Sequence, residues 1–405
     1  MKYTPVLIDL GGLSACCTDH ALESLAKSIS GEDSHDIWDP HHSPFIERII
    51  ELFTKRGLMM LGKVQEGLKL WTEGAMHKHY PSPPAKPPGY VQNWSAEQSE
   101  LVHLYLTSLP PEQFVLSDWG MLVDYLLHTY MPEEVMRTEA EWLAVRSSIM
   151  GRVQASMASK TVTALQLDPV LAAMPLTLAA AQKAFNFGSR MDAVMAYGNA
   201  RCMNQVVALT STARQKIKKS ILEHTFKKMQ GDPDATREVL HSKLFDEFAA
   251  LNRDWRRIAV TEAGENANQG MLSSLKPGAR LKRMEQYKGA CPFCKKIDGV
   301  VMTVVSPDAE KKNGDAEVWV GKTNAGRSAA LRKRAGDELI ERTPSELWWI
   351  PAGTVHPNCR GGWFLMPGGG PHDDAGFQEW LDKHFHQNKQ SPTTGNDQQH
   401  KRTGA

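Results

Sequence analysis

Cysteine is scarce in this sequence, and the few cysteines are unevenly distributed. There are six in 405 residues, which is too few for a disulfide framework in a chain of this length. Cys16, Cys17 and Cys202 stand apart and are interpreted as ordinary thiols, whereas the other three share the C-terminal third with a histidine motif. This usage favours a reducing compartment such as the cytoplasm.

Long apolar runs and an excess of one charge are also lacking. No stretch approaches the roughly 20 apolar residues that a membrane helix needs, so we expect no membrane partner. The chain has 47 basic and 46 acidic residues, so its overall charge does not indicate nucleic-acid binding. No histidine is followed two residues later by glutamate, which argues against a zinc deaminase. With no other catalytic constellation in view, we expect no enzyme activity.

Two short motifs carry the clearest chemical signal. Cys291-Pro-Phe-Cys294 and His356-Pro-Asn-Cys359 each place two metal-binding side chains three positions apart. Together they offer three thiolates and one imidazole, a common ligand set for structural Zn²⁺. Prolines, and Asn358 in the second motif, suit tight turns that point both ligands the same way. The sequence therefore predicts a structural zinc site made by Cys291, Cys294, His356 and Cys359.

The expected energetics support this zinc site. The two motifs are separated by 61 residues, 295–355, and closing such a loop costs about 3.6 kcal/mol plus a constant. Structural zinc contributes roughly 10–16 kcal/mol in small zinc fingers, so the metal outweighs the closure. Three thiolates, a neutral imidazole and Zn²⁺ sum to a net charge of −1, which we expect the adjacent Lys295, Lys296 and Arg360 to neutralise.

Other interpretations of the cysteines are weaker. A redox role for Cys291 and Cys294 would need a βαβ context, which the sequence does not indicate. The cysteines could also be unrelated thiols. Catalytic zinc is disfavoured because four protein ligands leave no open coordination position.

The rest of the pattern predicts a mainly α-helical chain with a small C-terminal α+β unit, in which a zinc knot ties antiparallel strands. Helices are expected over 44–76, 95–160 and 168–230, the last with a break between Thr210 and Thr212, and over 234–272. Expected strands are Gly299–Val305, Val318–Val320, Leu347–Ile350 and Gly362–Met366. Near the N-terminus a strand is expected at Pro5–Leu10 and a helix at Asp19–Ser28.

Composition suggests four segments. The Pro-rich stretch 81–89 is typical of a stiff linker. The predicted segments are an N-terminal region with helix and linker (1–90), a helical domain (91–250), the zinc-knot α+β domain (251–370) and a tail (371–405) that is disordered after 387.

Local basic runs leave DNA open as an alternative partner. The helix over 212–230 and the polar loop over 321–338 are both rich in lysine and arginine, although a solvated face is the default interpretation of each. The candidate nucleic-acid-binding residues are Lys216, Lys218, Lys219, Lys227, Lys228, Arg332, Lys333 and Arg334.

Three stretches carry a resemblance to a known family. An R-x-x-x-x-T-E element at 256–262, the C-x-x-C motif followed by Asp298-Gly299 and a strand, and His356-Pro-Asn-Cys-Arg360 resemble the Mu F-like phage head morphogenesis proteins. The resemblance covers about residues 190–366. Thr261 and Glu262 within the first element are expected to anchor their helix against the zinc knot. The family often ends its motif Cys-Arg-Cys, whereas this chain has Gly361 in the last position.

The resemblance implies a minor head protein of a tailed phage or prophage. Such a protein is a structural component of the virion that acts in head assembly in the host cytoplasm, near the portal or inside the capsid. The implied partners are portal, major capsid or scaffold protein. The alternatives are a DNA-contacting virion protein that aids genome packaging or ejection and, less favoured, a zinc hydrolase or transferase.

Overall fold

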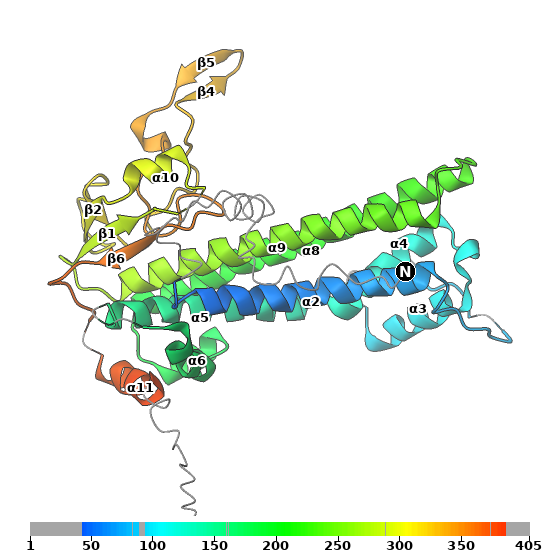
Figure 1. Ribbon diagram of the computed structural model, residues 1–405, viewed down its shortest axis with the longest axis horizontal. Helices are drawn as coiled ribbons and strands as arrows, with labels where there is room; N and C mark the ends of the chain where they lie inside the picture. The colour runs from blue at the N-terminus through cyan, green and yellow to red at the C-terminus, as the bar shows by residue number, and fades with distance from the viewer. Residues whose placement is uncertain are drawn as a thin grey trace, which may run out of the picture.

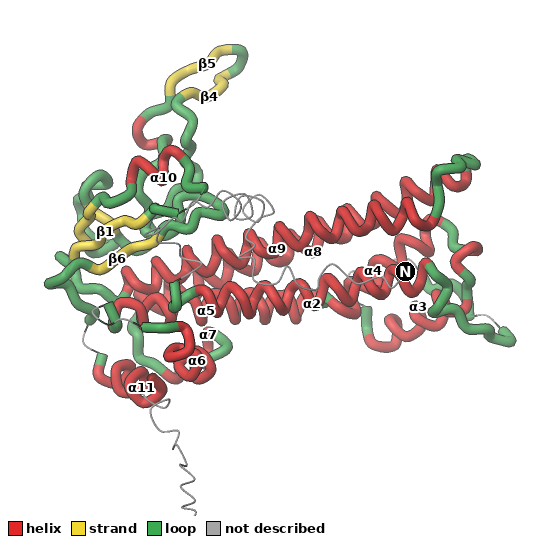
Figure 2. Tube along the Cα trace, viewed as in Figure 1, coloured by secondary structure: helices red, strands yellow, loops and turns green. Residues whose placement is uncertain are grey.

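The computed structural model is mainly helical, with a small sheet region towards the C-terminus (Figure 1, Figure 2). It describes residues 43–385, except 83, 89–93, 159, 161, 288 and 373. The strand and helix predicted before residue 30, and the tail predicted to be disordered after 387, lie outside these residues. None of the described helices combines the length and apolar character needed to cross a bilayer.

Long helices lying side by side form an elongated arm (Figure 1). They are α2 (Glu47–Thr72), α5 (Glu133–Ser156), α8 (Ser189–Met229) and α9 (Arg237–Ser273). Their apolar faces share one large core, in which Phe53 and Trp255 stack with ring centres 4.8 Å apart and are fully buried. The predicted helical domain (91–250) and the predicted α+β domain (251–370) were expected to meet at residue 251. That residue lies inside α9, so this one helix spans parts of both segments.

Helix α8 corrects one sequence prediction. It is a single helix of 41 residues, about 60 Å long at 1.5 Å per residue, without the predicted break before Thr212. The Thr212 hydroxyl donates to the carbonyl of Ala208 within the helix instead of capping a new one. The helix ends at Gly231, whose φ of +76° is readily adopted by glycine.

Glycines allow the arm helices to approach closely. A Cβ on Gly151 would lie 1.9 Å from the carbonyl oxygen of Ala267, and one on Gly270 would lie 2.1 Å from that of Ser148. Helices α5 and α9 are therefore in backbone contact at this crossing. In α2, a Cβ on Gly57 would overlap the indole of Trp255, so the absence of a side chain at 57 lets Trp255 pack directly against α2.

Shorter helices cover both ends of the arm. They are α3 (Ala96–Ser108), α4 (Leu116–Tyr130), α6 (Ala164–Ala173), α7 (Leu178–Ala184) and α11 (Ala375–Phe385). Helix α3 begins with a capping box, because Ser95 and Gln98 each bond the other's backbone N–H through their side chains. The helical stretch expected over 95–160 is interrupted at Pro110 and Pro111, where the short 3-10 turn η2 (Pro111–Gln113) lies between α3 and α4.

The C-terminal unit contains a four-stranded sheet in the order β3-β2-β1-β6. β1 pairs antiparallel with both β2 and β6, while β3 runs parallel to β2. The strands are β1 (Arg280–Met284), β2 (Val301–Val304), β3 (Glu317–Val318) and β6 (Gly362–Leu365). A small core that includes Trp363 and Leu281 joins this sheet to the end of α9.

The strand predictions are partly right. β2 and β6 fall within predicted strands, and β3 overlaps the predicted Val318–Val320 only at Val318. The central strand β1 was missed because its sequence, Arg-Leu-Lys-Arg-Met, is highly charged. The predicted strand Leu347–Ile350 is wrong: after the 3-10 turn η3 (Pro344–Glu346) the chain is irregular, apart from one isolated bridge at Leu347. A separate hairpin, β4 (Arg332–Ala335) and β5 (Glu338–Glu341), extends away from the sheet (Figure 1).

Candidate metal centre

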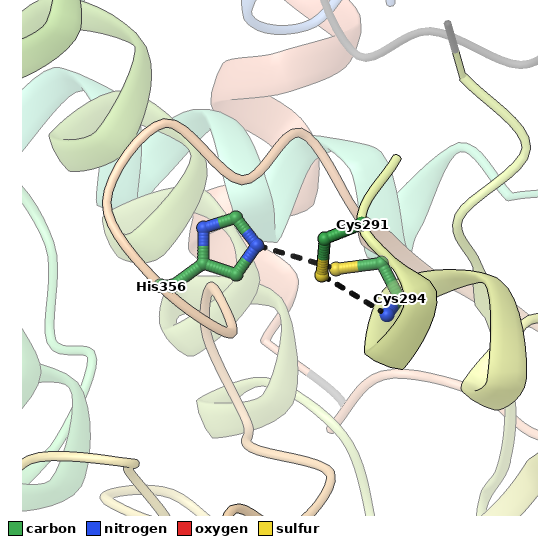
Figure 3. Close-up of side chains that lie close together, drawn as sticks. All are labelled: Cys291, Cys294 and His356. Carbon is green, nitrogen blue, oxygen red and sulfur yellow. Dashed lines mark hydrogen bonds between the residues drawn. The ribbon is translucent and has the colours of Figure 1, made fainter. Parts of the chain in front are cut away.

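The first cysteine pair lies at the start of the short helix α10 (Pro292–Ile297). Cys291 is its N-cap, and its Sγ accepts the backbone N–H of Cys294 at 3.4 Å. Pro292 occupies the first helical position, where the missing N–H has no cost. This turn places both sulfurs on the same side of the loop (Figure 3).

The second pair lies in a tight turn before β6. The N–H of Cys359 donates to the carbonyl of His356 at 3.0 Å, closing the turn. Asn358 between them has a φ of +64°, a left-handed conformation that asparagine tolerates better than most residues. The predicted role of Asn358 in a tight turn is therefore confirmed.

The distances among the sulfur and nitrogen atoms fit a zinc site. The Sγ of Cys294 lies 3.6 Å from His356 Nε2 and 4.0 Å from Cys359 Sγ. Tetrahedral zinc with bonds of about 2.3 Å to sulfur and 2.0 Å to nitrogen requires a sulfur–nitrogen separation of about 3.5 Å and a sulfur–sulfur separation of about 3.8 Å. Cys291, Cys294 and His356 form one group of donor atoms within 4.8 Å of one another, and Cys359 adjoins it through Cys294. The four predicted ligands are therefore brought together and could hold a metal ion.

The orientation of His356 favours metal binding. Its Nδ1 lies 2.8 Å from the carbonyl oxygen of Pro357. A carbonyl only accepts hydrogen bonds, so Nδ1 carries the proton and Nε2 keeps a free lone pair towards the sulfurs (Figure 3). This is the arrangement that orients most metal-binding histidines. The Trp348 ring stacks on the imidazole, with centres 5.5 Å apart, and restricts its rotation.

The electrostatics at the thiols are uneven. Burial raises the pKa of Cys291, but hydrogen bonds from Cys294, first of all from its backbone N–H, outweigh burial and lower this pKa. A hydrogen bond from Cys294 and the nearby charge of Arg283 lower the pKa of Cys359, whereas the same bond, together with burial, raises that of Cys294. Two of the three thiols thus favour the thiolate form that a metal requires.

The expected source of neutralising charge is corrected. Lys295 and Lys296 are exposed, whereas Arg360 is only 4 % exposed and Arg283 is fully buried. Arg283 Nε donates to Glu285 at 2.7 Å, and the Glu285 carboxylate lies 3.8 Å from Cys359 Sγ. With zinc and three thiolates at −1 and Glu285 at −1, the buried Arg283 and Arg360 bring the region to neutrality.

Arg283 and Glu285 are the residues that sequence analysis missed. They are two positions apart, at and just after the end of β1, so they lie on one face of the chain. Their proximity to Cys291 in the sequence was an available signal. Their burial was not, because charged residues are almost never fully buried unless paired, and the pairing depends on how the sheet folds over the turn at 353–361.

Helix α9 carries polar side chains that hold the C-terminal unit. Glu265 accepts hydrogen bonds from the backbone N–H of Thr354 at 2.5 Å and from its hydroxyl at 3.0 Å. Further bonds link Asn268 to the carbonyl of Gly361 and Gln269 to the N–H of Gly321. These contacts fix the metal-binding turn relative to the arm.

The two predicted anchors in α9 have different outcomes. Thr261 is confirmed as an anchor, since its hydroxyl accepts the N–H of Asn358 at 2.8 Å. Glu262 is not an anchor for the metal-binding turn. It faces the opposite neighbour, α8, where it accepts Arg201 Nε at 2.7 Å and is 3 % exposed.

Several basic residues of helix α8 are already engaged. Lys218 bonds the buried carboxylate of Asp124 at 2.6 Å. Lys219 and Lys227 lie within 4.0 Å of acidic neighbours, and Lys228 is exposed. Near the end of this helix Phe226 is 55 % exposed, while His224 is buried.

The basic residues of the predicted loop over 321–338 also differ in their exposure to solvent. Lys322 is 1 % exposed, with its Nζ bonded to the carbonyls of Gly314 and Glu317 and about 5 Å from the ring centres of two tryptophans, Trp319 and Trp349. In the hairpin, Lys333 pairs with Glu346, leaving Arg332 and Arg334 exposed.

A pocket of about 800 Å³ lies at the other end of the arm from the cysteines. Phe114, Trp119 and Leu240 contribute apolar walls, and Lys228 and Arg237 also line it. Its His224 is buried, and within the described part of the chain the Nδ1 atom has no hydrogen-bond partner. The pocket is therefore separate from the metal centre.

Comparison of the chain with protein-family models, with curated proteins and with solved structures found no match.

Proposed function

We propose that this chain is a structural component of a tailed-phage or prophage head, a minor head protein that acts in head assembly and contains a structural zinc ion. The observation that carries the proposal is the Cys291, Cys294, His356 and Cys359 cluster, in the same sequence context that resembles the head morphogenesis family. Portal, major capsid or scaffold protein is the proposed partner, and the phage head is the proposed location.

The donor set supports a structural role for the metal. Three sulfurs and one imidazole nitrogen can fill all four zinc positions, so no position is left for a substrate or an activated water. Cys294 and Cys359 are fully buried, and the turn containing His356 and Cys359 is tied to the arm through Thr261. Bound zinc would join α10 to this turn and hold the C-terminal unit on the end of α9.

The metal part of the proposal is tested on the full chain. We expect one zinc per chain by elemental analysis, and loss of that zinc in Cys294→Ser and in His356→Ala. Cys202→Ser is the matched control, because Cys202 is equally buried but bonds Glu262 and Asn266 between α8 and α9. Equal zinc content in all four proteins would contradict the proposed site.

The head part is tested separately. Mass spectrometry of purified particles should detect the chain at low copy number, and cells lacking it should release fewer infectious particles. Crosslinking within purified particles should join it to portal, capsid or scaffold protein. Recovery of the chain only outside particles would contradict this role without affecting the metal result.

DNA contact is a second candidate function, and the exposed hairpin arginines favour it. Arg332 and Arg334 lie on the same face of β4, on a hairpin that extends away from the body (Figure 1). We expect affinity for duplex DNA to fall steeply with salt and to drop in Arg332→Gln/Arg334→Gln. Lys295→Gln/Lys296→Gln, which removes two exposed charges elsewhere, is the control. Absence of binding at low salt would exclude this candidate.

A further inference from the structure

A second group of donor atoms overlaps the predicted zinc site. Glu285, Cys294 and Cys359 each place a donor atom within 4.8 Å of the other two, and all three residues are buried. The two Glu285 oxygens lie 3.9 and 3.8 Å from Cys359 Sγ. The carboxylate therefore lies next to the sulfurs of Cys294 and Cys359, whereas His356 belongs to the other group.

The surroundings hold this carboxylate in place. Its Oε1 accepts Arg283 Nε at 2.7 Å, and Arg283 in turn donates through Nη1 to the carbonyl of Gly353 at 2.9 Å. The backbone N–H of Glu285 donates to Asp298 at 2.8 Å. A Cβ at Gly361 would lie 1.8 Å from Oε1, so the absence of a side chain at 361 leaves the room that the carboxylate occupies.

Carboxylate oxygen is an accepted zinc ligand, with bonds of about 2.0–2.2 Å. Cys294 belongs to both donor groups, whereas Cys359 is shared with Glu285 rather than with His356. The fourth coordination position, next to Cys294, is thus within reach of both the Cys359 thiolate and the Glu285 carboxylate. A charged carboxylate beside a thiolate is costly to bury unless it is paired, and Arg283 supplies the pairing.

We propose that Glu285 is a reserve metal ligand, exchangeable with Cys359 at the fourth position. The site then binds metal through three sulfurs and His356, or through Cys291, Cys294, His356 and the Glu285 carboxylate. Loss of the Cys359 thiolate, by substitution or by oxidation, leaves a complete coordination sphere. This inference rests on the proposed zinc site and adds to it a second ligand set.

The proposal makes the three cysteines unequal. Cys291 does not belong to the group that contains Glu285, and Cys294 is needed in both ligand sets, so Cys359 is the only one of the three cysteines that Glu285 could replace. Substitution of Cys359 should therefore be tolerated better than substitution of Cys291. Because both are changed to serine, the comparison controls for the loss of one sulfur.

The test is a Co²⁺ titration of the full chain, followed by absorbance, in the wild type and in Cys291→Ser, Cys359→Ser, Glu285→Gln and Cys359→Ser/Glu285→Gln. We expect Cys359→Ser to bind one Co²⁺ per chain with Kd raised about 10- to 100-fold, comparable with losing an outer-sphere partner. Its sulfur-to-cobalt charge-transfer band should weaken as one thiolate is lost. Glu285→Gln alone should raise Kd no more than about 10-fold, and the double variant should show no saturable binding.

Several outcomes would overturn the proposal. One is Cys359→Ser binding no more tightly than the double variant; another is Cys291→Ser binding as well as Cys359→Ser. In either case wild-type binding would still support the zinc site, whereas a wild type that binds no Co²⁺ would contradict both. Metal binding and folding are coupled, so a variant unfolded without metal is followed by circular dichroism as Co²⁺ is added. If the Cys359→Ser protein stays unfolded when Co²⁺ is added, the proposal that Glu285 is a reserve ligand is also contradicted. The Cys359→Ala variant repeats the test without a serine hydroxyl that could itself bind the metal.

Discussion

The hydroxyl of Thr261 on α9 accepts the backbone N–H of Asn358 at 2.8 Å, in the middle of the turn that presents His356 and Cys359. The same hydroxyl donates to the carbonyl of Arg257 at 2.7 Å. One side chain on the long arm helix thus fixes the backbone between two candidate metal ligands. The position of the metal centre on the arm depends on contacts of this kind.

Thr261→Val tests that contact. The substitution keeps the shape but leaves the N–H of Asn358 without its acceptor, so we expect a loss of about 1–3 kcal/mol in the free energy of unfolding. Zinc affinity should fall about 10-fold, because the ligand-bearing turn is less well oriented. Denaturant unfolding and chelator competition measure the two effects. Thr261→Ser keeps the hydroxyl and should match the wild type in both stability and zinc affinity. Equal stability and affinity of the Thr261→Val and Thr261→Ser variants would show that the hydrogen bond from Asn358 is unimportant.

The contact between α5 and α9 gives a second prediction. Gly270→Ala places a methyl group 2.1 Å from the Ser148 carbonyl oxygen, where only backbone movement could relieve the overlap. We expect it to destabilise the fold by about 1–3 kcal/mol. Gly264→Ala is the control on the same helix, since its nearest atom is 3.4 Å away and alanine favours helix by up to about 1 kcal/mol. The reverse order of stabilities would argue against the close crossing.

Lys322 gives a prediction for the pH dependence of stability. Burial lowers its pKa to about 8, against an ordinary value of 10.5. Between these values the unfolded chain binds the proton and the folded chain does not, so this group makes folding more favourable as the pH rises from 8 to 10.5. The measurement is the difference between the wild type and Lys322→Met, which isolates the contribution of this side chain.

We expect the wild type to gain on the order of 3 kcal/mol relative to Lys322→Met over that pH range. Urea unfolding at pH 7.5, 9 and 10.5 provides the comparison. A difference that is constant with pH would mean that the ammonium keeps its ordinary pKa between Trp319 and Trp349.

Removal of metal should affect the two parts of the molecule unequally. The arm helices share a large core that does not include the candidate ligands, whereas Cys294 and Cys359 belong to a small cluster with Tyr287, Ile297 and Val355. After chelation we expect far-UV circular dichroism to remain largely helical. Limited proteolysis should become much faster between residues 285 and 361, and added Zn²⁺ should restore protection. Complete unfolding on chelation would show instead that the arm depends on the metal.

The ligand motifs and most helices could be predicted because their signals are local. A C-x-x-C or H-x-x-C spacing specifies which side chains can reach one ion, and the helical period of apolar residues indicates which face is buried. The break predicted before Thr212 was wrong because a threonine can cap a helix or bond back within one, and sequence does not distinguish these. Likewise, Leu347–Ile350 has strand-forming residues, but among the described residues its only bridge is the isolated one between Leu347 and Ser328.

What the sequence by itself determined was most of the helices, the region of the small sheet and the two motifs that contain four candidate metal ligands, because each of these signals lies in residues close together in the chain. The tertiary structure decided the rest. It buries Arg283 and Glu285 beside Cys359 and places the Thr261 hydroxyl against the turn that contains Asn358. It also buries Lys322 between two tryptophans instead of leaving it on a basic surface. Each depends on a contact between distant segments, because the free energy of a buried charge is set by the partners that the fold brings to it.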